Sequence, residues 1–185
     1  MKKAEARKYY RNIRKEFSKE IIQEKSELIF DHIKQMNLLD YSTFHIFLPI
    51  EKNHEINTYP IIDWLFDHNK NVVLPFVIGD DMINCKVEKG FKTALNSLQI
   101  PEPIKYTAID SHLIDVVFLP MFVADLKGNR VGYGGGYYDR FLSKCKSETK
   151  KIGLSYFRPI DMIEDAYEGD IPLDYLLTSE EIVSF

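Results

Sequence analysis

The sequence predicts an α/β protein with a mainly parallel sheet and helices on both of its faces. Two observations lead to this fold class. Strand-like segments alternate with helical segments along the chain, as a parallel sheet requires. Residues 115–122 form a nearly continuous apolar run rich in β-branched residues, which is typical of a buried central strand. The length of 185 residues fits a single domain, residues 1–185, with a sizeable core.

The composition is that of an ordinary globular protein, with 45% hydrophobic and 28% charged residues. A net charge of −4 gives no support to nucleic-acid binding. The charged N-terminus lacks an apolar signal core, and no apolar run is long enough to cross a bilayer. Cys85 and Cys145 are too few for a disulfide framework. We therefore expect a cytoplasmic protein without a membrane or nucleic-acid partner, and we take a monomer as its assembly.

The first two helices are predicted from the spacing of apolar residues. Residues 2–17 and 19–36 each carry apolar side chains at helical intervals, and Ser18 can cap the second helix. The first helix also carries a basic stripe beside its apolar stripe, formed by Lys3, Arg7, Arg11 and Arg14. We expect Arg11 and Arg14 to be a solvated basic face.

The strands are predicted from short runs of apolar and β-branched residues. They cover residues 43–48, 72–77, 82–87, 115–122 and 151–157. A third helix runs through Trp64 to about residue 68, and a short fourth helix runs from 138 to about 145. His45 is expected to be a packed side chain of the first strand and not a ligand.

Residues 128–140 carry most of the chemistry. Four glycines fall within residues 132–136, between the central strand and the fourth helix. Glycines let backbone N–H groups approach an anion, and a helix N-terminus adds partial positive charge. Arg130 and Arg140 are permanent cations suited to phosphate, and Asp139 offers a hard oxygen ligand to Mg²⁺. This combination predicts a phosphate and metal site in place of a merely flexible connection.

Two common nucleotide-binding motifs do not account for this stretch. In a G-x-G-x-x-G spacing counted from Gly132, Tyr137 stands where the last glycine belongs. No Gly-Lys-Ser/Thr follows, as a P-loop requires, and the stretch lies late in the chain. The residues by themselves indicate phosphate and metal, and they do not name the substrate.

The segment 119–142 resembles the signature of the 5-formyltetrahydrofolate cyclo-ligase family, also called methenyltetrahydrofolate synthetases. That family reads apolar-Pro-x-x-x-Phe-Asp and then Gly-x-Arg-Leu-Gly-x-Gly-x-Gly-Tyr-Tyr-Asp. This chain departs from it mildly, with Ala124 in place of an aromatic residue and Val131 in place of leucine. The resemblance implies a Rossmann-like sheet of the class that includes ribose-phosphate isomerase and coenzyme A transferases.

The resemblance also implies a site for MgATP. Lys3 and Arg7 are implied to contact the phosphates, and their i, i+4 spacing puts both on one helix face. Asp139 and Asp170 are implied to bind Mg²⁺, although Gly169 stands where the family usually has histidine. The remaining ATP-binding residues are Arg130, Gly132, Tyr133, Gly134, Gly135, Gly136, Tyr137 and Tyr138. No protein nucleophile is expected, because Lys3, Arg7 and Arg130 would act by stabilising charge.

For the folate, the resemblance implies that Glu55 accepts hydrogen bonds from the N–H groups of the pterin. The second contact is an apolar residue near the end of the first strand, where Ile50 and Leu48 are both candidates. The glycine loop from Tyr133 to Tyr137 is implied to touch folate as well as nucleotide. Residues 100–103 resemble the Glu-Pro segment of the family, and we expect them to have only a structural role.

The implied activity is the ATP-dependent closure of 5-formyltetrahydrofolate to 5,10-methenyltetrahydrofolate, with release of ADP and phosphate. A phosphorylated formyl group, an imidoyl phosphate, would be the intermediate. Two alternatives remain. A non-catalytic folate or nucleotide-binding module would keep Glu55 and the loop without hydrolysing ATP. A small-molecule kinase on the same fold would not depend on Glu55.

Overall fold

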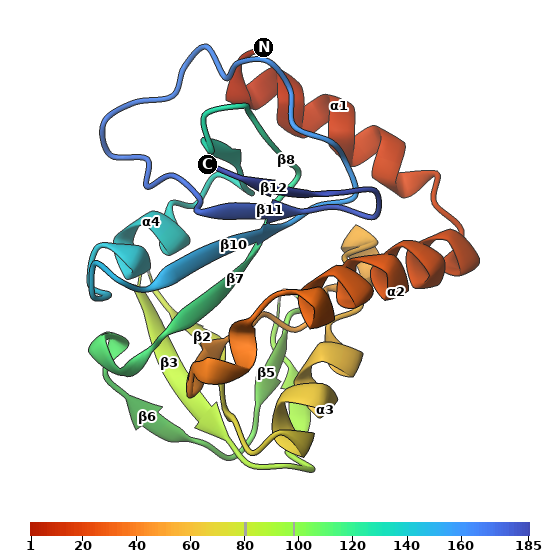
Figure 1. The fold of residues 1–185 in the computed structure, drawn as a ribbon. Helices are drawn as coiled ribbons and strands as arrows, with labels where there is room; N and C mark the ends of the chain where they lie inside the picture. Colours follow the sequence, from red (N-terminus) through yellow and green to blue (C-terminus); the bar gives the residue numbers. More distant parts are fainter. Residues whose placement is uncertain (80, 98) are drawn as a thin grey trace.

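The computed structural model of the protein describes residues 1–79, 81–97 and 99–185. Its main element is an eight-stranded sheet with the strand order β12-β11-β10-β7-β1-β2-β3-β6 (Figure 1). Five neighbouring strands of this sheet are parallel: β11 (Tyr175–Leu177), β10 (Lys150–Leu154), β7 (Val116–Pro120), β1 (Thr43–His45) and β2 (Asn71–Ile78). The prediction of an α/β fold with a mostly parallel sheet is therefore confirmed.

Antiparallel strands extend the sheet at both edges. At one edge, β12 (Ile182–Ser184) pairs with β11. At the other edge, β3 (Asp81–Val87) pairs with β2, and β6 (Thr107–Ile109) pairs with β3. Two small ribbons lie outside the sheet: β4 (Thr93–Leu95) with β5 (Pro101–Pro103), and β8 (Val123–Ala124) with β9 (Arg130–Val131).

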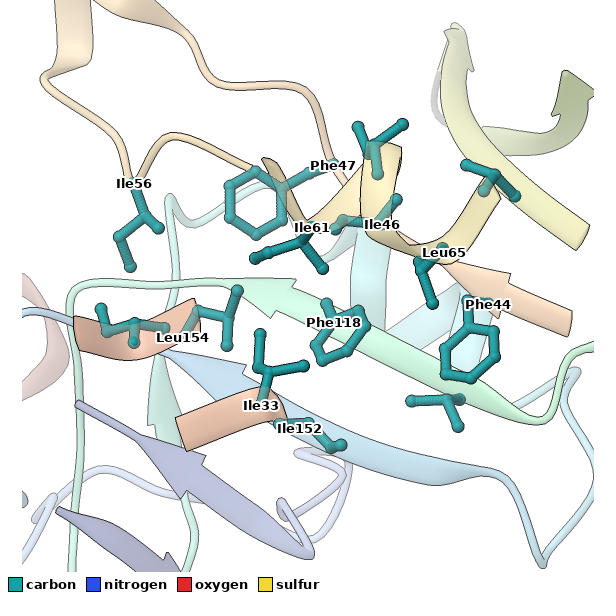
Figure 2. Close-up of a cluster of buried hydrophobic side chains, with 14 of the residues drawn as sticks. Ile33, Phe44, Ile46, Phe47, Ile56, Ile61, Leu65, Phe118, Ile152 and Leu154 are labelled. Carbon is teal, nitrogen blue, oxygen red and sulfur yellow. The ribbon is translucent and has the colours of Figure 1, made fainter. Parts of the chain in front are cut away.

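One face of the sheet is covered by α2 (Lys19–Gln35) and α3 (Tyr59–Asp67), which lie together at the lower right of Figure 1. Side chains alternate between the faces of a strand, so Val116 and Phe118 of β7 point to this side. They pack with Ile33 of α2 and Leu65 of α3 in the largest buried apolar cluster (Figure 2). Phe118 is completely buried, so β7 is a core strand as its composition predicts.

The opposite face is covered by the short helix α4 (Tyr137–Leu142). Val117 and Leu119 of β7 point to this side and join a second buried cluster with Phe141 and Leu142 of α4. Because α2 and α3 pack on one face and α4 packs on the other, the predicted arrangement of helices on both faces is confirmed.

The first helix, α1 (Lys3–Lys15), does not lie on the sheet. Its residues Ala6 and Tyr10 form a third cluster with Phe122, Val123 and Val131, which belong to the β8–β9 ribbon and its approach. Figure 1 shows α1 above β8 and close to the last part of the chain. This packing holds the first helix beside the glycine-rich stretch that follows β9.

Most predicted elements are present with changed ends. Ser18 caps α2 as expected, because its Oγ accepts a hydrogen bond from the N–H of Ile21 at 3.3 Å. The first strand is shorter than predicted, since β1 ends at His45. The chain adds three short 3-10 helices that apolar spacing does not reveal: η1 (Leu38–Asp40), η2 (Glu51–Asn53) and η3 (Ser111–Leu113). Among the described residues, no helix is both long and apolar enough to span a bilayer.

His45 is completely buried on β1 and packs against the rings of Tyr138 and Phe141, with ring centroids 6.0 and 4.6 Å away. Within the described part of the chain, neither of its ring nitrogens has a hydrogen-bond partner. Burial lowers the pKa of His45 to about 3. His45 is thus the packed side chain that the sequence predicts.

This histidine predicts a pH dependence of stability. An unfolded histidine titrates near ~6.5, so below that pH the unfolded chain binds a proton that the folded chain does not. The free energy of unfolding should therefore fall between pH ~6.5 and 3, by up to ~1.4 kcal/mol per pH unit from this group. His45→Leu should remove that contribution. Urea denaturation at pH 7.5, 6 and 5 would measure it, and an equal loss of stability in variant and wild type would assign the effect to other groups.

Candidate active site

A pocket of about 480 Å³ opens at the carboxyl ends of the parallel strands. Residues from three strands line the pocket there. They are Pro120 at the end of β7, Phe47 and Leu48 just after β1, and Pro75 and Val77 in the second half of β2. These three strands are neighbours in the sheet. Ligands of open α/β sheets bind at this edge, because loops leave the strands there and diverge.

One part of the pocket is apolar. Leu48 and Ile50 line it from the segment after β1, so both candidates for the second folate contact lie in the wall. Met82 of β3 adds to this part. Residues Ile100, Pro101 and Glu102 line the pocket as well, so the segment that was expected to have only a structural role forms part of the pocket wall. A flat aromatic ligand would find apolar surfaces here on several elements.

The glycine loop, residues 132–136, connects β9 to α4 and forms one wall of the pocket. Gly134 has φ +102° and Gly136, at the N-cap of α4, has φ +67°. Both values lie in the left-handed region that side chains disfavour. The loop can therefore turn sharply into α4 and present its first N–H groups toward the pocket.

Helix α1 lies outside the sheet and holds the glycine loop in place through Arg7. The Nε of Arg7 donates a hydrogen bond of 2.8 Å to the carbonyl oxygen of Gly132. A Cβ atom at Gly134 would lie 3.3 Å from Cζ of Arg7, so glycine also leaves room for the guanidinium. The other end of the loop is held by Tyr137, whose hydroxyl donates to the carbonyl oxygen of Gly79 at 3.1 Å.

Two cation–carboxylate pairs form the polar part of the pocket. Lys3 pairs with Asp170, and Arg130 pairs with Asp139 at 2.6 Å. The N–H of Ile171 also donates to the Asp139 carboxylate at 3.2 Å, which brings the two pairs into one region. Arg130 is buried. The pocket thus gathers one pair that is nine residues apart in the sequence, Arg130 with Asp139, and one that is 167 residues apart, Lys3 with Asp170.

Glu55 lies deep in the pocket wall with only 6% of its surface exposed. Its carboxylate accepts hydrogen bonds from the N–H of Ile50 at 2.8 Å and from the hydroxyl of Tyr133. Burial raises the pKa of Glu55, whereas these two donors and the charge of Arg14 lower it. The segment is held in place by Thr58, whose hydroxyl donates to the carbonyl oxygen of Phe47 at 2.7 Å. Glu55 is therefore not a solvated acid at the start of a helix.

Arg140, the second arginine that the sequence offers to phosphate, does not line this pocket, whereas every residue that the family resemblance implies as a contact of ATP, folate or metal does. The set is Lys3, Arg7, Ile50, Glu55, Arg130, Gly132, Tyr133, Gly134, Gly135, Gly136, Tyr137, Tyr138, Asp139 and Asp170. The individual ligand roles of these residues stay predictions. Asp165 and Tyr167 also line the pocket and were not predicted. Asp165 accepts a 2.7 Å hydrogen bond from the N–H of Lys3, and the ring of Tyr167 lies 4.8 Å from Nζ of Lys3.

The expectation for Arg14 is wrong. Arg14 is only 4% exposed, and its Nη2 donates a 2.7 Å hydrogen bond to the hydroxyl of Tyr133. Arg11 is exposed as expected. Helical periodicity places both residues on the basic stripe, but it does not tell which of them faces the glycine loop. One feature of the sequence could have indicated that Arg14 faces the loop. Arg14 follows Arg7 by seven residues, and this spacing puts both on the same side of the helix.

The carboxylates of Asp139 and Asp170 fit a Mg²⁺ site in their chemistry. Both offer hard oxygen ligands to the same pocket, and Mg²⁺ commonly takes one or two carboxylates together with phosphates and water. In the described part of the chain, no group of three or more histidine, cysteine or acidic side chains could hold a metal without a ligand's help. Two carboxylates alone would leave the other coordination positions of a bound Mg²⁺ to phosphate oxygens and water.

Comparison with known proteins identifies relatives along the whole chain. The model of the 5-formyltetrahydrofolate cyclo-ligase family matches residues 1–165. A probable 5-formyltetrahydrofolate cyclo-ligase of Caenorhabditis elegans is 28% identical and covers 99% of this chain and 95% of its own. The 5-formyltetrahydrofolate cyclo-ligase of Escherichia coli K12 is 29% identical, with 69% of this chain and 74% of its own chain covered.

Two solved structures share the fold. The 5,10-methenyltetrahydrofolate synthetase of Aquifex aeolicus is 27% identical, with a TM-score of 0.85 over 100% of this chain and 93% of that one. The 5,10-methenyltetrahydrofolate synthetase of Mycoplasma pneumoniae is 22% identical, with a TM-score of 0.78 over 97% of this chain and 100% of that one. The second likeness supports the fold alone.

The glycine loop predicts a difference between two of its glycines. Gly136→Ala should lower the free energy of unfolding by about 1–2 kcal/mol, the cost of a side chain in the left-handed region. A Cβ atom there would also lie 2.8 Å from Nη1 of Arg140. Gly132→Ala is the matched control, because its Cβ would meet no atom within 4 Å. Urea denaturation of both variants measures the difference, and equal effects would contradict the backbone argument.

Proposed function

The chain belongs to the 5-formyltetrahydrofolate cyclo-ligase family, and we propose that it converts 5-formyltetrahydrofolate to 5,10-methenyltetrahydrofolate with consumption of ATP in the presence of Mg²⁺. One observation carries the proposal: a single pocket joins a buried carboxylate, Glu55, to the cations Lys3, Arg7 and Arg130 across the glycine loop. A reaction between a nucleotide and a folate needs both kinds of site within reach of each other.

The chemistry starts from a poor leaving group. The N5-formyl group is an amide, and its oxygen does not leave by itself. Transfer of the γ-phosphoryl group of ATP to that oxygen forms an imidoyl phosphate and releases ADP. The N10 nitrogen then attacks the activated carbon, the C–O bond breaks, and phosphate leaves with the former formyl oxygen. Loss of the N10 proton gives the methenyl ring. Phosphoryl transfer of this kind depends mainly on positioning and charge stabilisation.

The cationic part of the pocket supplies that stabilisation. Lys3 and Arg7 lie on one face of α1, and Arg130 approaches from β9. The glycine loop between them offers N–H groups at the start of α4, and such groups favour phosphate oxygens. Tyr133, Gly134, Gly135, Gly136 and Tyr137 lie between this region and Glu55, where they would contact both ligands. Tyr138 would be the remaining contact to the nucleotide.

Asp139 and Asp170 would hold Mg²⁺, which when bound neutralises charge on the phosphates. In the free protein each of these carboxylates is paired with a cation of the phosphate site, Arg130 and Lys3 respectively. Binding of MgATP would therefore exchange partners: the carboxylates would turn to the metal, and the freed cations to phosphate oxygens. This exchange leaves no charge unpaired before or after binding.

Glu55 would bind the pterin. An ionised carboxylate has about four acceptor sites, and in the free protein Ile50 and Tyr133 provide two donors. The remaining sites can accept the amino and ring N–H groups of a pterin. Ile50 and Leu48 would cover the ring with apolar surface.

The proposed activity is tested by near-ultraviolet absorbance of the purified protein with 5-formyltetrahydrofolate, Mg²⁺ and ATP. The methenyl product is more extensively conjugated than the substrate and should absorb at longer wavelength. We expect a rise that requires ATP. Folate binding by calorimetry without such a rise would indicate a binding module, and absence of both would indicate a different phosphoryl-transfer enzyme.

Glu55→Gln should reduce the affinity for 5-formyltetrahydrofolate by about 2–5 kcal/mol, the usual cost of removing one partner of a buried charged hydrogen bond. Calorimetric titration with the folate measures this, and titration with MgADP serves as the control for the nucleotide side. Unchanged folate affinity with an intact nucleotide site would place the pterin elsewhere in the pocket.

Asp139→Asn should raise the Mg²⁺ concentration required for half-maximal activity by tenfold or more, on the order of 1.4 kcal/mol in metal binding. The reason is that the variant removes the charge of one proposed ligand while keeping its shape. Asp161→Asn, at an exposed position outside the pocket lining, is the matched control. A superimposable Mg²⁺ titration of the Asp139 variant and wild type would remove Asp139 from the metal site.

A further inference from the structure

Arg14 stands out because it is a buried charge with no assigned role. It lies on α1 with 4% of its surface exposed, between the rings of Phe122 and Tyr133, whose centroids lie 4.5 and 5.6 Å from its Cζ. Among the described residues its Nε has no hydrogen-bond partner. Burying a guanidinium is costly, and cation–π contacts with two rings offset only part of that cost. A charge at this position therefore calls for a compensating charge nearby.

That compensating charge is Glu55. Arg14 Nη2 donates to the oxygen of the Tyr133 hydroxyl at 2.7 Å, and the same hydroxyl donates to Oε1 of Glu55. A hydroxyl group has only one proton. Because guanidinium can only donate, the hydroxyl oxygen must accept from Arg14 and its single proton must point at Glu55. The Arg14 cation, at one end of this series of hydrogen bonds, therefore sets the direction of both of them.

We propose that Arg14 is a positioning residue of the folate site, which acts through Tyr133 to keep the Glu55 carboxylate ionised and oriented toward the pterin. The proposal rests on the proposed function for the identity of the ligand. The coupling between Arg14 and Glu55 itself does not depend on that function. Because Tyr133 belongs to the glycine loop, the loop would position Glu55 in addition to contacting the proposed nucleotide.

The ionised state matters because a pterin edge offers N–H donors. A protonated carboxyl group would present its own O–H donor and lose part of its acceptor capacity. Burial raises the pKa of Glu55, and the hydrogen bonds from Tyr133 and Ile50 and the positive charge of Arg14 oppose this effect. The other titratable groups that face Glu55 are Tyr138 of α4 and Tyr156, both of which are neutral hydroxyls with raised pKa. Among the described residues, Arg14 is thus the cation whose charge lowers the pKa of this carboxylate.

Removal of Arg14 removes an influence that lowers the pKa of Glu55, so the pKa rises further and a smaller fraction of Glu55 is ionised at neutral pH. Raising the pH should restore ionisation. A variant without the cation should therefore bind folate poorly at neutral pH and approach wild-type affinity in alkaline solution. A purely structural loss would be the same at every pH.

The decisive experiment compares Arg14→Met with Arg14→Lys and with Arg11→Met. Arg11 is the matched control, because it is an exposed cation of the same helix with its Cζ 5.6 Å from the same Phe122 ring. Calorimetric titration with 5-formyltetrahydrofolate would be done at pH 6, 7, 8 and 9, each variant relative to wild type at the same pH. We expect Arg14→Met to bind the folate several-fold more weakly than wild type at pH 7, because a smaller fraction of Glu55 is ionised, and to regain most of that affinity at pH 9.

Arg14→Lys should fall between Arg14→Met and wild type, since lysine keeps the charge but not the planar fork of donors. Arg11→Met should match wild type throughout. MgADP binding should change little in any of the variants. A loss in Arg14→Met that is equal at all four pH values, or no loss at all, would overturn the proposal.

A second measurement separates this inference from the proposed function. Titration of the Glu55 carboxyl carbon by NMR, in protein labelled with ¹³C at glutamate carboxyl groups, needs no ligand. The resonance would be assigned with Glu55→Gln. A higher pKa of Glu55 in Arg14→Met than in wild type would support the coupling even if wild-type protein failed to bind folate, in which case only the proposed function would fall. An unchanged Glu55 pKa would overturn the role of Arg14 whatever the folate titration gave.

Discussion

The candidate site depends on the docking of α1 against the β8–β9 ribbon. Ala6 is completely buried there, in a cluster with Phe122, Val123 and Val131. Helix α1 makes no part of the sheet, yet it brings Lys3, Arg7 and Arg14 to the glycine loop. If this apolar contact were lost, the loop would lose the Arg7 hydrogen bond and the Arg14 contact together. A small hydrophobic contact therefore determines where the charges of the site lie.

Charge balance is the second organising feature. The pocket holds several ionised side chains, and the described contacts pair them: Lys3 with Asp170, Arg130 with Asp139, and Arg14 with Glu55 through Tyr133. Partly buried pairs of this kind are costly to break singly. A ligand that offers both a cation and an anion, as a metal–nucleotide complex does, can replace two partners at once. The free pocket is thus arranged for a ligand with both charges.

The irregular segment between β10 and β11 is held by hydrogen bonds instead of a regular ladder. Asp125 is completely buried, and its carboxylate accepts from the N–H groups of Lys127 and Asn129 within its own turn and from the N–H of Ile163 in the irregular segment. This one side chain therefore joins the turn before β9 to the chain that carries Asp165, Tyr167 and Asp170. The side of the pocket proposed for metal and nucleotide is positioned by polar contacts, whereas the side proposed for folate rests on the apolar core of the sheet.

The sequence by itself determined the elements whose causes are local. The apolar run of β7 predicts a central strand, the Ser18 hydroxyl predicts a helix start, and the clustered glycines predict a phosphate loop, because burial pattern, capping and backbone freedom act over a few residues. The resemblance to the family signature indicated which residues would gather in the pocket. Only the tertiary structure decided that Arg14 is buried, since its partner Tyr133 lies 119 residues away and helical spacing is the same for a solvated and a buried arginine. The contact of Glu55 with Tyr133 and the ion pair of Lys3 with Asp170 were likewise decided by packing between distant segments, whose contacts no local pattern records.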